Sequence, residues 1–377
     1  MLNLKSSKRA KVFNMTAKKK VLHVSTALSW RGGEQQLAYL LDELRDEIVQ
    51  FVLCAKGSEM EAFCHKNGFN YYAVKKVSSF DFGFAKTLKS ICNNLSIDVC
   101  HLHDAHAHTF AILAAFMGNK CPLVLSRRVD FPIKNSFFSR LKYNHPAIFK
   151  ILCVSKKIKE ITTSDIKDKS KLSVVYSGID LNKFSKRNGK LRKELNISND
   201  IRLIGNTSAL ADHKDYFTFL DVAERIIESE RNVHFVIFGN GPLEEKIKAY
   251  AKSKKLNDQL TFLGYRTDVP MLLADLDLFL ITSKTEGLGT SIIDAFACKV
   301  PVVATAAGGI PELVEDQKTG LLCPVKDVDF LSANVSKLLN DASLSQQIIK
   351  DASEKVKQFS KEHTAKETLK HYQEIWS

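Results

Sequence analysis

Residues Asp277–Ala307 read DLFLITSKTEGLGTSIIDAFACKVPVVATAA, and this stretch decides the fold. A short apolar strand, Leu278–Thr282, leads into a glycine-containing loop. A helix is expected over Ser291–Ala297, and a second apolar strand starts at Pro301. A strand, helix and strand of these lengths predict a βαβ unit in a parallel sheet. Such sheets bind ligands beyond the carboxyl ends of their strands, which is where the loop lies.

The loop Glu286-Gly287-Leu288-Gly289-Thr290-Ser291 favours a phosphate ligand. Glycine lets backbone N–H groups approach a ligand closely, and a helix N-terminus adds unpaired donors and a positive dipole. Two carboxylates, Glu286 and Asp294, flank this loop and suit the hydroxyls of a sugar and of a ribose. The alternative is that Glu286 is a surface loop residue and Asp294 a solvated helix residue.

Strands and helices alternate outward from this unit in both directions. The chain has 377 residues, more than the ~250–300 that a single hydrophobic core usually fills, so two domains are expected. The fold class predicted is α/β, with two Rossmann-like doubly wound parallel-sheet domains facing a cleft. The expected segments are a basic tail (1–19), an N-terminal domain (20–185), a linker (186–199), a C-terminal domain (200–358) and a C-terminal helix (359–377), which is expected to pack back on the N-terminal domain.

Positive charge is concentrated in the first half of the chain. Residues 1–185 carry 29 Lys and Arg against 15 Asp and Glu, whereas residues 186–377 carry 26 against 27. This asymmetry indicates an anionic partner for the first half, or a charge that serves only solubility. The tail is either a surface-binding arm or the product of a start codon upstream of Met15, and both interpretations remain open.

Aromatic and basic residues interleave over Phe131–Lys150 (FPIKNSFFSRLKYNHPAIFK). This pattern suits a helix lying on an anionic membrane surface, and equally an ordinary amphipathic core helix. Composition excludes other classes. The eight cysteines form no zinc spacing, and no apolar run approaches the ~18–20 residues of a membrane span. Without a secretory leader the protein is expected to be cytoplasmic, and a peripheral position on the inner face of the membrane is the open alternative.

Histidines cluster near Asp104, at His101, His103, His106 and His108. Their spacing could ligate a metal. The preferred interpretation is that His103 and Asp104 end a strand and face the cleft, with no metal. Motifs that read nucleic acid are missing, so no nucleic-acid partner is expected.

Six segments, in this order along the chain, resemble the retaining GT-B glycosyltransferases of family four. Glu286 and Asp294 correspond to the two acids of that family's glutamate–seven-residue–glutamate motif. The resemblance extends from about Val21 to about Lys357. The segments are Arg31–Glu34 (RGGE), Asp98–Asp104 (DVCHLHD), Tyr176–Asp180 (YSGID), Gly239–Pro242 (GNGP), Phe262–Arg266 (FLGYR) and Gly308–Glu312 (GGIPE).

The resemblance implies a role for each matching residue. Glu286 contacts the transferred sugar, Asp294 holds the ribose, and Lys214 neutralises charge on the departing nucleotide. Fixed cations and oriented N–H donors suit a diphosphate leaving group, so neither a cofactor nor a metal is expected. The expected catalytic residues are Glu286, Lys214 and His103; the expected donor-binding residues are Gly32, Gly33, Arg266, Gly287, Leu288, Gly289, Thr290 and Asp294; and the expected acceptor-side residues are Arg127 and Arg128.

Three positions depart from the family pattern. Asp294 replaces the second glutamate, and Ser208–Leu210 occupies the stretch that usually holds an arginine. Arg128, beside Arg127, stands where many members have a histidine, and arginine cannot act as a base near neutral pH. These departures suggest a distinct subgroup with an unusual acceptor side or donor.

The function predicted is transfer of a sugar, with retention, from a nucleoside-diphosphate sugar, most often a UDP-sugar, to a glycan or lipid-linked acceptor. Such a reaction belongs to cell-surface polysaccharide or lipopolysaccharide assembly. The alternatives are a sugar-nucleotide epimerase or hydrolase of the same fold, and a non-catalytic polyanion-binding protein. No particular oligomeric state is predicted.

Overall fold

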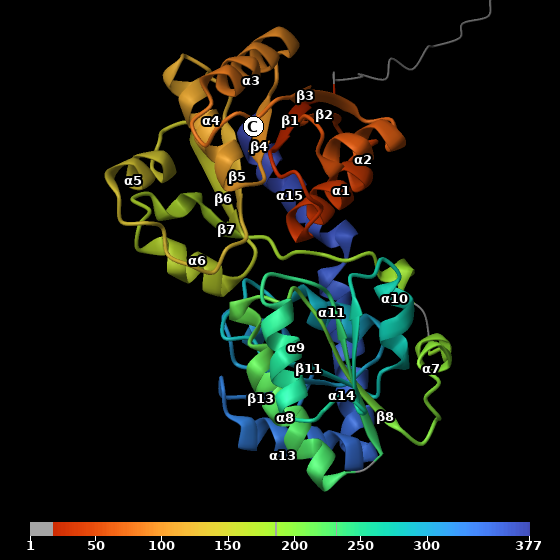
Figure 1. The fold of residues 1–377 in the computed structure, drawn as a ribbon. Coiled ribbons are helices and arrows are strands. Elements are labelled where there is room, and N and C mark those ends of the chain that lie inside the picture. The colour runs from red at the N-terminus through yellow and green to blue at the C-terminus, as the bar shows by residue number, and fades with distance from the viewer. Residues whose placement is uncertain (1–17, 185–186, 231) are drawn as a thin grey trace, which may run out of the picture.

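The computed structural model describes residues 18–184, 187–230 and 232–377, which form two α/β domains stacked end to end (Figure 1). The N-terminal domain runs from red to yellow-green and the C-terminal domain from green to blue. The two interpretations of the tail concern residues 1–17, which lie outside the described residues. In the described part of the chain, no helix combines the length and apolarity needed to cross a membrane.

A parallel sheet of strand order β3-β2-β1-β4-β5-β6-β7 forms the centre of the N-terminal domain. Helices α3, α4 and α6 pack on one face, and α1, α2 and α15 on the other. The strands are β1 (Lys20–Ser25), β2 (Val49–Ala55), β3 (Asn70–Val74), β4 (Val99–Leu102), β5 (Leu123–Arg127), β6 (Ile148–Cys153) and β7 (Leu172–Val174). The helices are α1 (Gly32–Glu43), α2 (Glu59–Asn67), α3 (Phe82–Leu95), α4 (Ala105–Phe116), α5 (Phe137–Tyr143), α6 (Lys156–Thr163) and the C-terminal α15 (Lys361–Trp376).

The C-terminal domain repeats this architecture with the strand order β10-β9-β8-β11-β12-β13. Helices α8, α9 and α13 pack on one face, and α10, α11 and α12 on the other. The strands are β8 (Arg202–Thr207), β9 (Val233–Phe238), β10 (Leu260–Gly264), β11 (Leu278–Ile281), β12 (Val302–Thr305) and β13 (Leu321–Cys323). The helices are α7 (Lys190–Glu194), α8 (Tyr216–Ser229), α9 (Glu244–Ser253), α10 (Val269–Leu272), α11 (Thr290–Ala297), α12 (Ile310–Leu313), α13 (Val328–Asn340) and α14 (Ala342–Lys355).

Both sheets are wound outward from a central parallel strand, so the predicted fold class is confirmed. The strands are apolar because helices cover both faces: Val21, Leu22 and Val24 of β1 are fully buried. The two domains enclose a cleft of about 640 Å³. The loop after β11 and the first turn of α1 both line this cleft, so the carboxyl ends of the two sheets meet there.

The chain crosses between the domains twice. Residues 187–191 are held on the C-terminal domain by Asp275, whose carboxylate accepts hydrogen bonds from the N–H groups of Gly189 and Leu191 (both 2.7 Å). Near the C-terminus the chain returns upward, and α15 packs on α1 (Figure 1). The hydroxyl of Tyr372 on this helix lies 2.5 Å from His101 Nδ1. Helix α15 therefore connects the C-terminal domain to the face of the N-terminal sheet that α1 also covers.

Candidate functional site

The glycine loop after β11 forms the floor of the cleft. Gly289 adopts φ 90°, a left-handed conformation that glycine accommodates best, and it begins α11 without a capping side chain among the described residues. A Cβ at Gly287 would lie 2.7 Å from the carbonyl oxygen of Arg128 in the other domain. Glycine at 287 thus permits close approach of the two domains. The unpaired N–H groups of the first turn of α11 are available to an anion.

Glu286 and Lys214 form a buried ion pair beneath this loop. The Glu286 carboxylate also accepts a hydrogen bond from the hydroxyl of Ser283 (2.9 Å). Lys214 ends a 3-10 turn that follows β8, and that turn is fixed to the β11 loop because the Lys284 N–H donates to His213 O (2.8 Å). The positive and negative charges are therefore held rigidly at adjacent strand ends, where a diphosphate could compete with Glu286 for Lys214.

Asp294 lies in the second turn of α11 and also lines the cleft. Burial raises the pKa of its carboxyl group to about 7. No hydrogen bond or ion pair joins the Asp294 side chain to another described residue. The hydroxyl of Tyr39, on α1 of the opposite domain, has its pKa raised to about 12 chiefly by burial, with the charge of Asp294 contributing. Asp294 is thus an unpaired acceptor inside the cleft, suited to a ligand hydroxyl.

The opposite wall of the cleft belongs to the N-terminal domain. Gly32 and Gly33 begin α1 there. Arg128 follows β5, donates to the hydroxyl of Ser177 (3.3 Å), and has its pKa lowered to about 10 by burial. Its Nε has no hydrogen-bond partner among the described residues. A cation so placed suits an anionic ligand group.

The structure brings together most of the predicted site. These residues line the one cleft: Gly32, Gly33, Arg128, Lys214, Glu286, Gly287, Leu288, Gly289, Thr290 and Asp294. Three predicted residues do not line it. They are His103, Arg127 and Arg266, and each has a physical reason for its position.

His103 lies in the interior with His23 and His101. His23 Nδ1 is 3.1 Å from His103 Nε2, and burial lowers the pKa of His103 well below its usual value. Ligand atoms of the three rings lie within 4.8 Å of one another, so the cluster could hold a metal ion. Both nitrogens of His101 are already hydrogen-bonded, to Tyr372 and to Ser126. The three rings form a buried cluster in which His103 Nδ1 has no hydrogen-bond partner among the described residues, and His103 does not line the cleft where it was expected.

Arg127 and Arg266 serve their own domains. Arg127 is buried and donates to the hydroxyls of Thr162 on α6 and Tyr143 on α5 (both 2.8 Å). Arg266 pairs with Asp268 (2.8 Å) and Glu194 (2.6 Å). Both guanidinium groups are therefore occupied by contacts within their own domains, and neither lines the cleft.

The residues that line the cleft without having been predicted include Gln36 and Tyr39. Gln36 and Tyr39 lie one and two turns after Gly32 on the same face of α1, and both line the cleft. The side-chain amide of Gln36 donates to the carbonyl oxygen of Gly178 (2.6 Å) and accepts from the N–H group of Gly178 (2.9 Å). The helical spacing from Gly32 was a signal that could have identified them.

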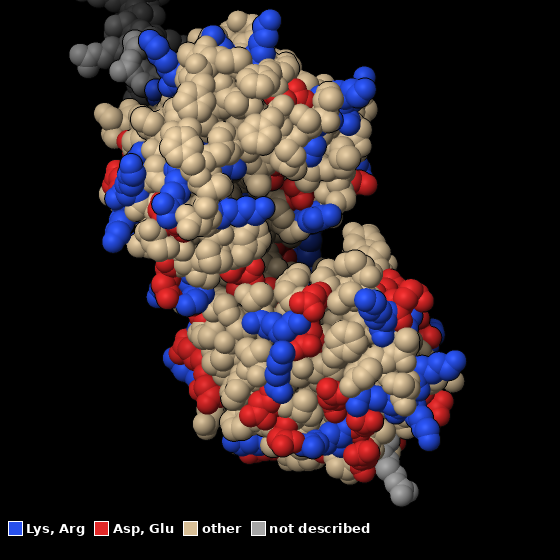
Figure 2. Space-filling view, turned by 60° about the vertical axis from the view of Figure 1, so that its left-hand side comes forward, with Lys and Arg blue, Asp and Glu red and all other residues tan. Residues whose placement is uncertain are grey.

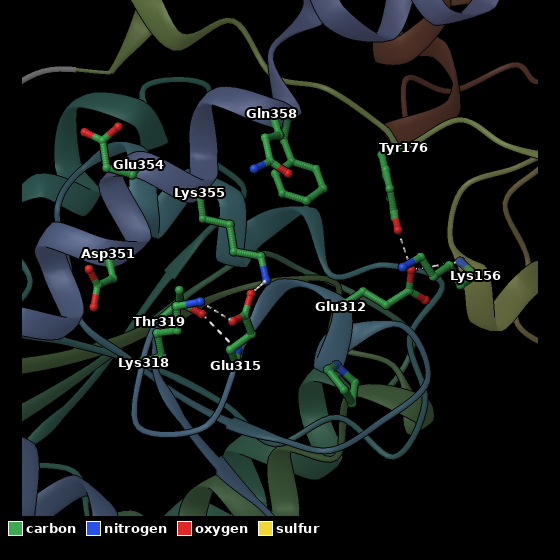
Figure 3. Close-up of a pocket in the computed structure, with 12 residues that line it drawn as sticks. Lys156, Tyr176, Glu312, Glu315, Lys318, Thr319, Asp351, Glu354, Lys355 and Gln358 are labelled. Atoms are coloured by element: carbon green, nitrogen blue, oxygen red, sulfur yellow. Dashed lines mark hydrogen bonds and ion pairs between the residues drawn. The ribbon is translucent and has the colours of Figure 1, made fainter.

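A carboxylate on α12 joins the domains beside the cleft (Figure 3). Glu312 accepts hydrogen bonds from the N–H groups of Lys156 and Lys157 (both 2.8 Å) and from the hydroxyl of Tyr176 (2.9 Å). The first two are unpaired donors at the start of α6, where the helix dipole favours a negative charge. These contacts hold the domains together. Glu315, one turn on, pairs instead with Lys318 and Lys355 of its own domain.

Family comparisons agree with this geometry. Residues 188–355 match the family described as "Glycosyl transferases group 1", and residues 30–183 match "Glycosyltransferase Family 4". The chain belongs to the group 1, family 4 glycosyltransferases. This glycosyltransferase is thus an enzyme with the GT-B fold, and the resemblance based on its sequence motifs is confirmed.

Individual relatives of the glycosyltransferase have different acceptors in their names. The chain is 26% identical to the N-acetyl-alpha-D-glucosaminyl L-malate synthase of Bacillus anthracis over 301 residues (78% of this chain, 79% of that one). It is 24% identical over 352 residues (90% and 91%) to the N-acetylgalactosamine-N,N'-diacetylbacillosaminyl-diphospho-undecaprenol 4-alpha-N-acetylgalactosaminyltransferase of Campylobacter jejuni. The crystal structure of Anabaena Alr3699/HepE in complex with UDP and glucose has the same fold (TM-score 0.82, 19% identity, 94% and 100% coverage).

Proposed function

We propose that this glycosyltransferase moves a sugar from a UDP-sugar to a lipid-linked glycan acceptor, with retention of anomeric configuration, in the assembly of a cell-surface polysaccharide or lipopolysaccharide. The observation that carries the proposal is the Lys214–Glu286 pair beneath the open N-terminus of α11 in the interdomain cleft. A cation and N–H donors converge there on a space that can take a diphosphate.

The charges assign a role to each group during transfer. The bond between the anomeric carbon and the diphosphate oxygen breaks, the oxygen of the acceptor hydroxyl forms the new bond to that carbon, and the hydroxyl proton passes to the departing diphosphate. Negative charge then grows on the leaving diphosphate, where Lys214 and the N–H groups of Gly289 and Thr290 would stabilise it. The carboxylate of Glu286 would contact the transferred sugar, and that of Asp294 the ribose. The proposal requires no metal ion.

The donor and acceptor are supported by relatives. The Escherichia coli relative UDP-Gal:alpha-D-GlcNAc-diphosphoundecaprenol alpha-1,3-galactosyltransferase is 28% identical over 262 residues, covering 64% of this chain and 68% of that one. It and the Campylobacter jejuni relative both name a diphosphoundecaprenol-linked acceptor. The Anabaena neighbour was crystallised with UDP. On the acceptor side, Arg128 offers this chain a buried cation for an anionic acceptor group.

The test is product formation from defined substrates. The full chain is incubated with a panel of UDP- and GDP-sugars and a diphosphoundecaprenol-linked sugar, and products are identified by mass spectrometry. The proposal predicts a lipid-linked product longer by one sugar with a UDP-sugar, and none with the Glu286→Ala variant. An altered sugar nucleotide formed without acceptor would instead indicate an epimerase, and release of free sugar alone would indicate a hydrolase.

A further inference from the structure

Exposed apolar side chains gather on one part of the N-terminal domain. Of the fifteen large hydrophobic residues exposed in the described part of the chain, nine lie between Val77 and Phe149. Helix α5 has no buried residue within its described length, and Phe137 at its start is 84% exposed. Helix α5 therefore lies at the surface of the domain, with Tyr143 half-buried against the core. The nine residues are Val77, Phe80, Phe82, Phe116, Val129, Phe131, Phe137, Leu141 and Phe149.

Contacts join these segments into one surface. The rings of Phe80 and Phe138 lie 5.0 Å apart, which places the loop before α3 against α5. Lys142 on α5 donates to the hydroxyl of Thr109 on α4 (3.2 Å). Arg127 donates both to the carbonyl oxygen of Phe131 and to the hydroxyl of Tyr143 on α5. We call this the α5 surface: the loop around Phe80 and Phe82, the loop around Phe131, and α5.

Positive charge surrounds the α5 surface. Lys75, Lys86, Lys134 and Arg140 are exposed beside its aromatic residues. Figure 2 shows the upper domain as a largely tan face with blue side chains around it, whereas red and blue mix over the lower domain. This composition complements a surface that is negatively charged outside and apolar beneath.

Three nearby carboxylates hydrogen-bond to neutral donors within the fold. Asp81 accepts from the N–H groups of Val77 (2.8 Å) and Phe84 (2.9 Å). Asp104 accepts from Thr26 and from the first N–H groups of α4. Asp130 accepts from the hydroxyl of Thr285 in the other domain (2.6 Å). These hydrogen bonds fix the three carboxylates without cancelling their charge, and the lysines and arginine are the more exposed charged groups of the α5 surface.

We propose that the α5 surface docks on a bilayer containing anionic phospholipid. Exposed phenylalanines would enter the interface between headgroups and acyl chains, while lysine and arginine would meet the phosphates. This inference rests on the proposed lipid-linked acceptor, which would be anchored in the same bilayer. The loop that starts at Arg128 on the cleft wall leads directly to Phe131 and α5, so docking would bring the acceptor side of the cleft to the membrane.

The test is flotation of the full chain with vesicles of phosphatidylcholine alone and of phosphatidylcholine with phosphatidylglycerol at ~30 mol%. Each basic side chain near an anionic surface contributes about fivefold to binding, so Lys134→Gln with Arg140→Gln should weaken partitioning about 25-fold. Phe137→Ser should weaken it about fivefold. The matched controls in the C-terminal domain are Lys246→Gln with Lys252→Gln, and Phe330→Ser, all at exposed positions.

The inference predicts binding to the anionic vesicles only, weakening as salt is raised, with loss in the α5-surface variants and not in the controls. All chains carry the same N-terminal tail, so its charge cannot produce that difference. Absence of anionic-vesicle binding, equal binding by variants and controls, or a self-associated chain dispersed by Phe137→Ser would overturn it. Thermal stabilisation by UDP is measured for the parent chain and for each variant. If UDP does not stabilise the parent chain, the proposed function is contradicted, whereas vesicle flotation still tests the docking proposal on its own.

Discussion

Asp294→Asn tests whether the unpaired carboxyl group in the cleft receives the donor. Burial raises the pKa of Asp294 to about 7, so near neutral pH about half of the unliganded chains carry the protonated form. Hydroxyl donors of a ribose bind the carboxylate better than the acid. The affinity of the parent chain for a UDP-sugar should therefore rise about tenfold between about pH 6 and about pH 8, because binding must first remove that proton.

The assay is calorimetric titration with a UDP-sugar, whose diphosphate is esterified at both ends and does not itself titrate in this range. Asp294→Asn should bind more weakly at the upper pH and with affinity nearly independent of pH. Stability supplies a second readout. Because the folded-state pKa is raised, stability falls as pH rises through about 7, and the parent chain should lose about 2–4 kcal/mol relative to Asp294→Asn between about pH 4 and pH 8. Parallel pH profiles for the parent chain and the variant would refute the reasoning.

Two further substitutions separate chemistry from domain closure. Glu286→Gln keeps the size of the side chain and its contact with Ser283 but loses the charge, so transfer should fall ~10²–10³-fold in a rate assay. UDP affinity should be retained or increased, because Lys214 no longer pairs with a carboxylate; unchanged turnover would remove Glu286 from the site. Glu312→Ala abolishes three hydrogen bonds between the domains, so small-angle scattering should show a more open chain and kcat/KM should fall about tenfold or more. Glu315→Ala is the matched control, and equal effects of the two would contradict the role of Glu312.

The fold and the floor of the site could be predicted because their signals are local. The β11 loop and α11 combine glycines, a helix start and two carboxylates within Glu286–Asp294. Lys214 was placed in the site by the resemblance to the family, not by a local signal of its own. That it pairs with Glu286 could not be read from the sequence, because the two residues meet only when β8 and β11 lie side by side.

The alternation of side chains along a strand explains why Arg127 and His103 do not line the cleft as expected. Successive side chains on a strand point to opposite faces, so Arg127 and Arg128 diverge: Arg127 enters the core with Thr162, and Arg128 reaches the cleft. His101 and His103 share a face, and His23 pairs in register with His101 on the adjacent strand. The same period of two, applied to these strand ends, would have placed His103 inside.

Arg266 and the α5 surface depended on contacts between segments distant in sequence. Arg266 binds Glu194, which lies in the segment read as a linker, and nothing local marks that pairing. The interleaved pattern over Phe131–Lys150 fitted a core helix and a surface helix equally, and only the exposure of Phe137 distinguishes them. Local sequence thus predicted which residues line the cleft better than it predicted which side chains serve the fold.

Calorimetric titration of UDP into the parent chain and into Lys214→Ala tests the central claim most directly, namely that the cleft is a nucleotide-sugar site. We expect saturable one-to-one binding to the parent chain and affinity at least ~tenfold weaker for the variant, since a charge-assisted contact to phosphate contributes about 1.5–3 kcal/mol. Binding of equal strength in two folded proteins, or binding to neither, would contradict it.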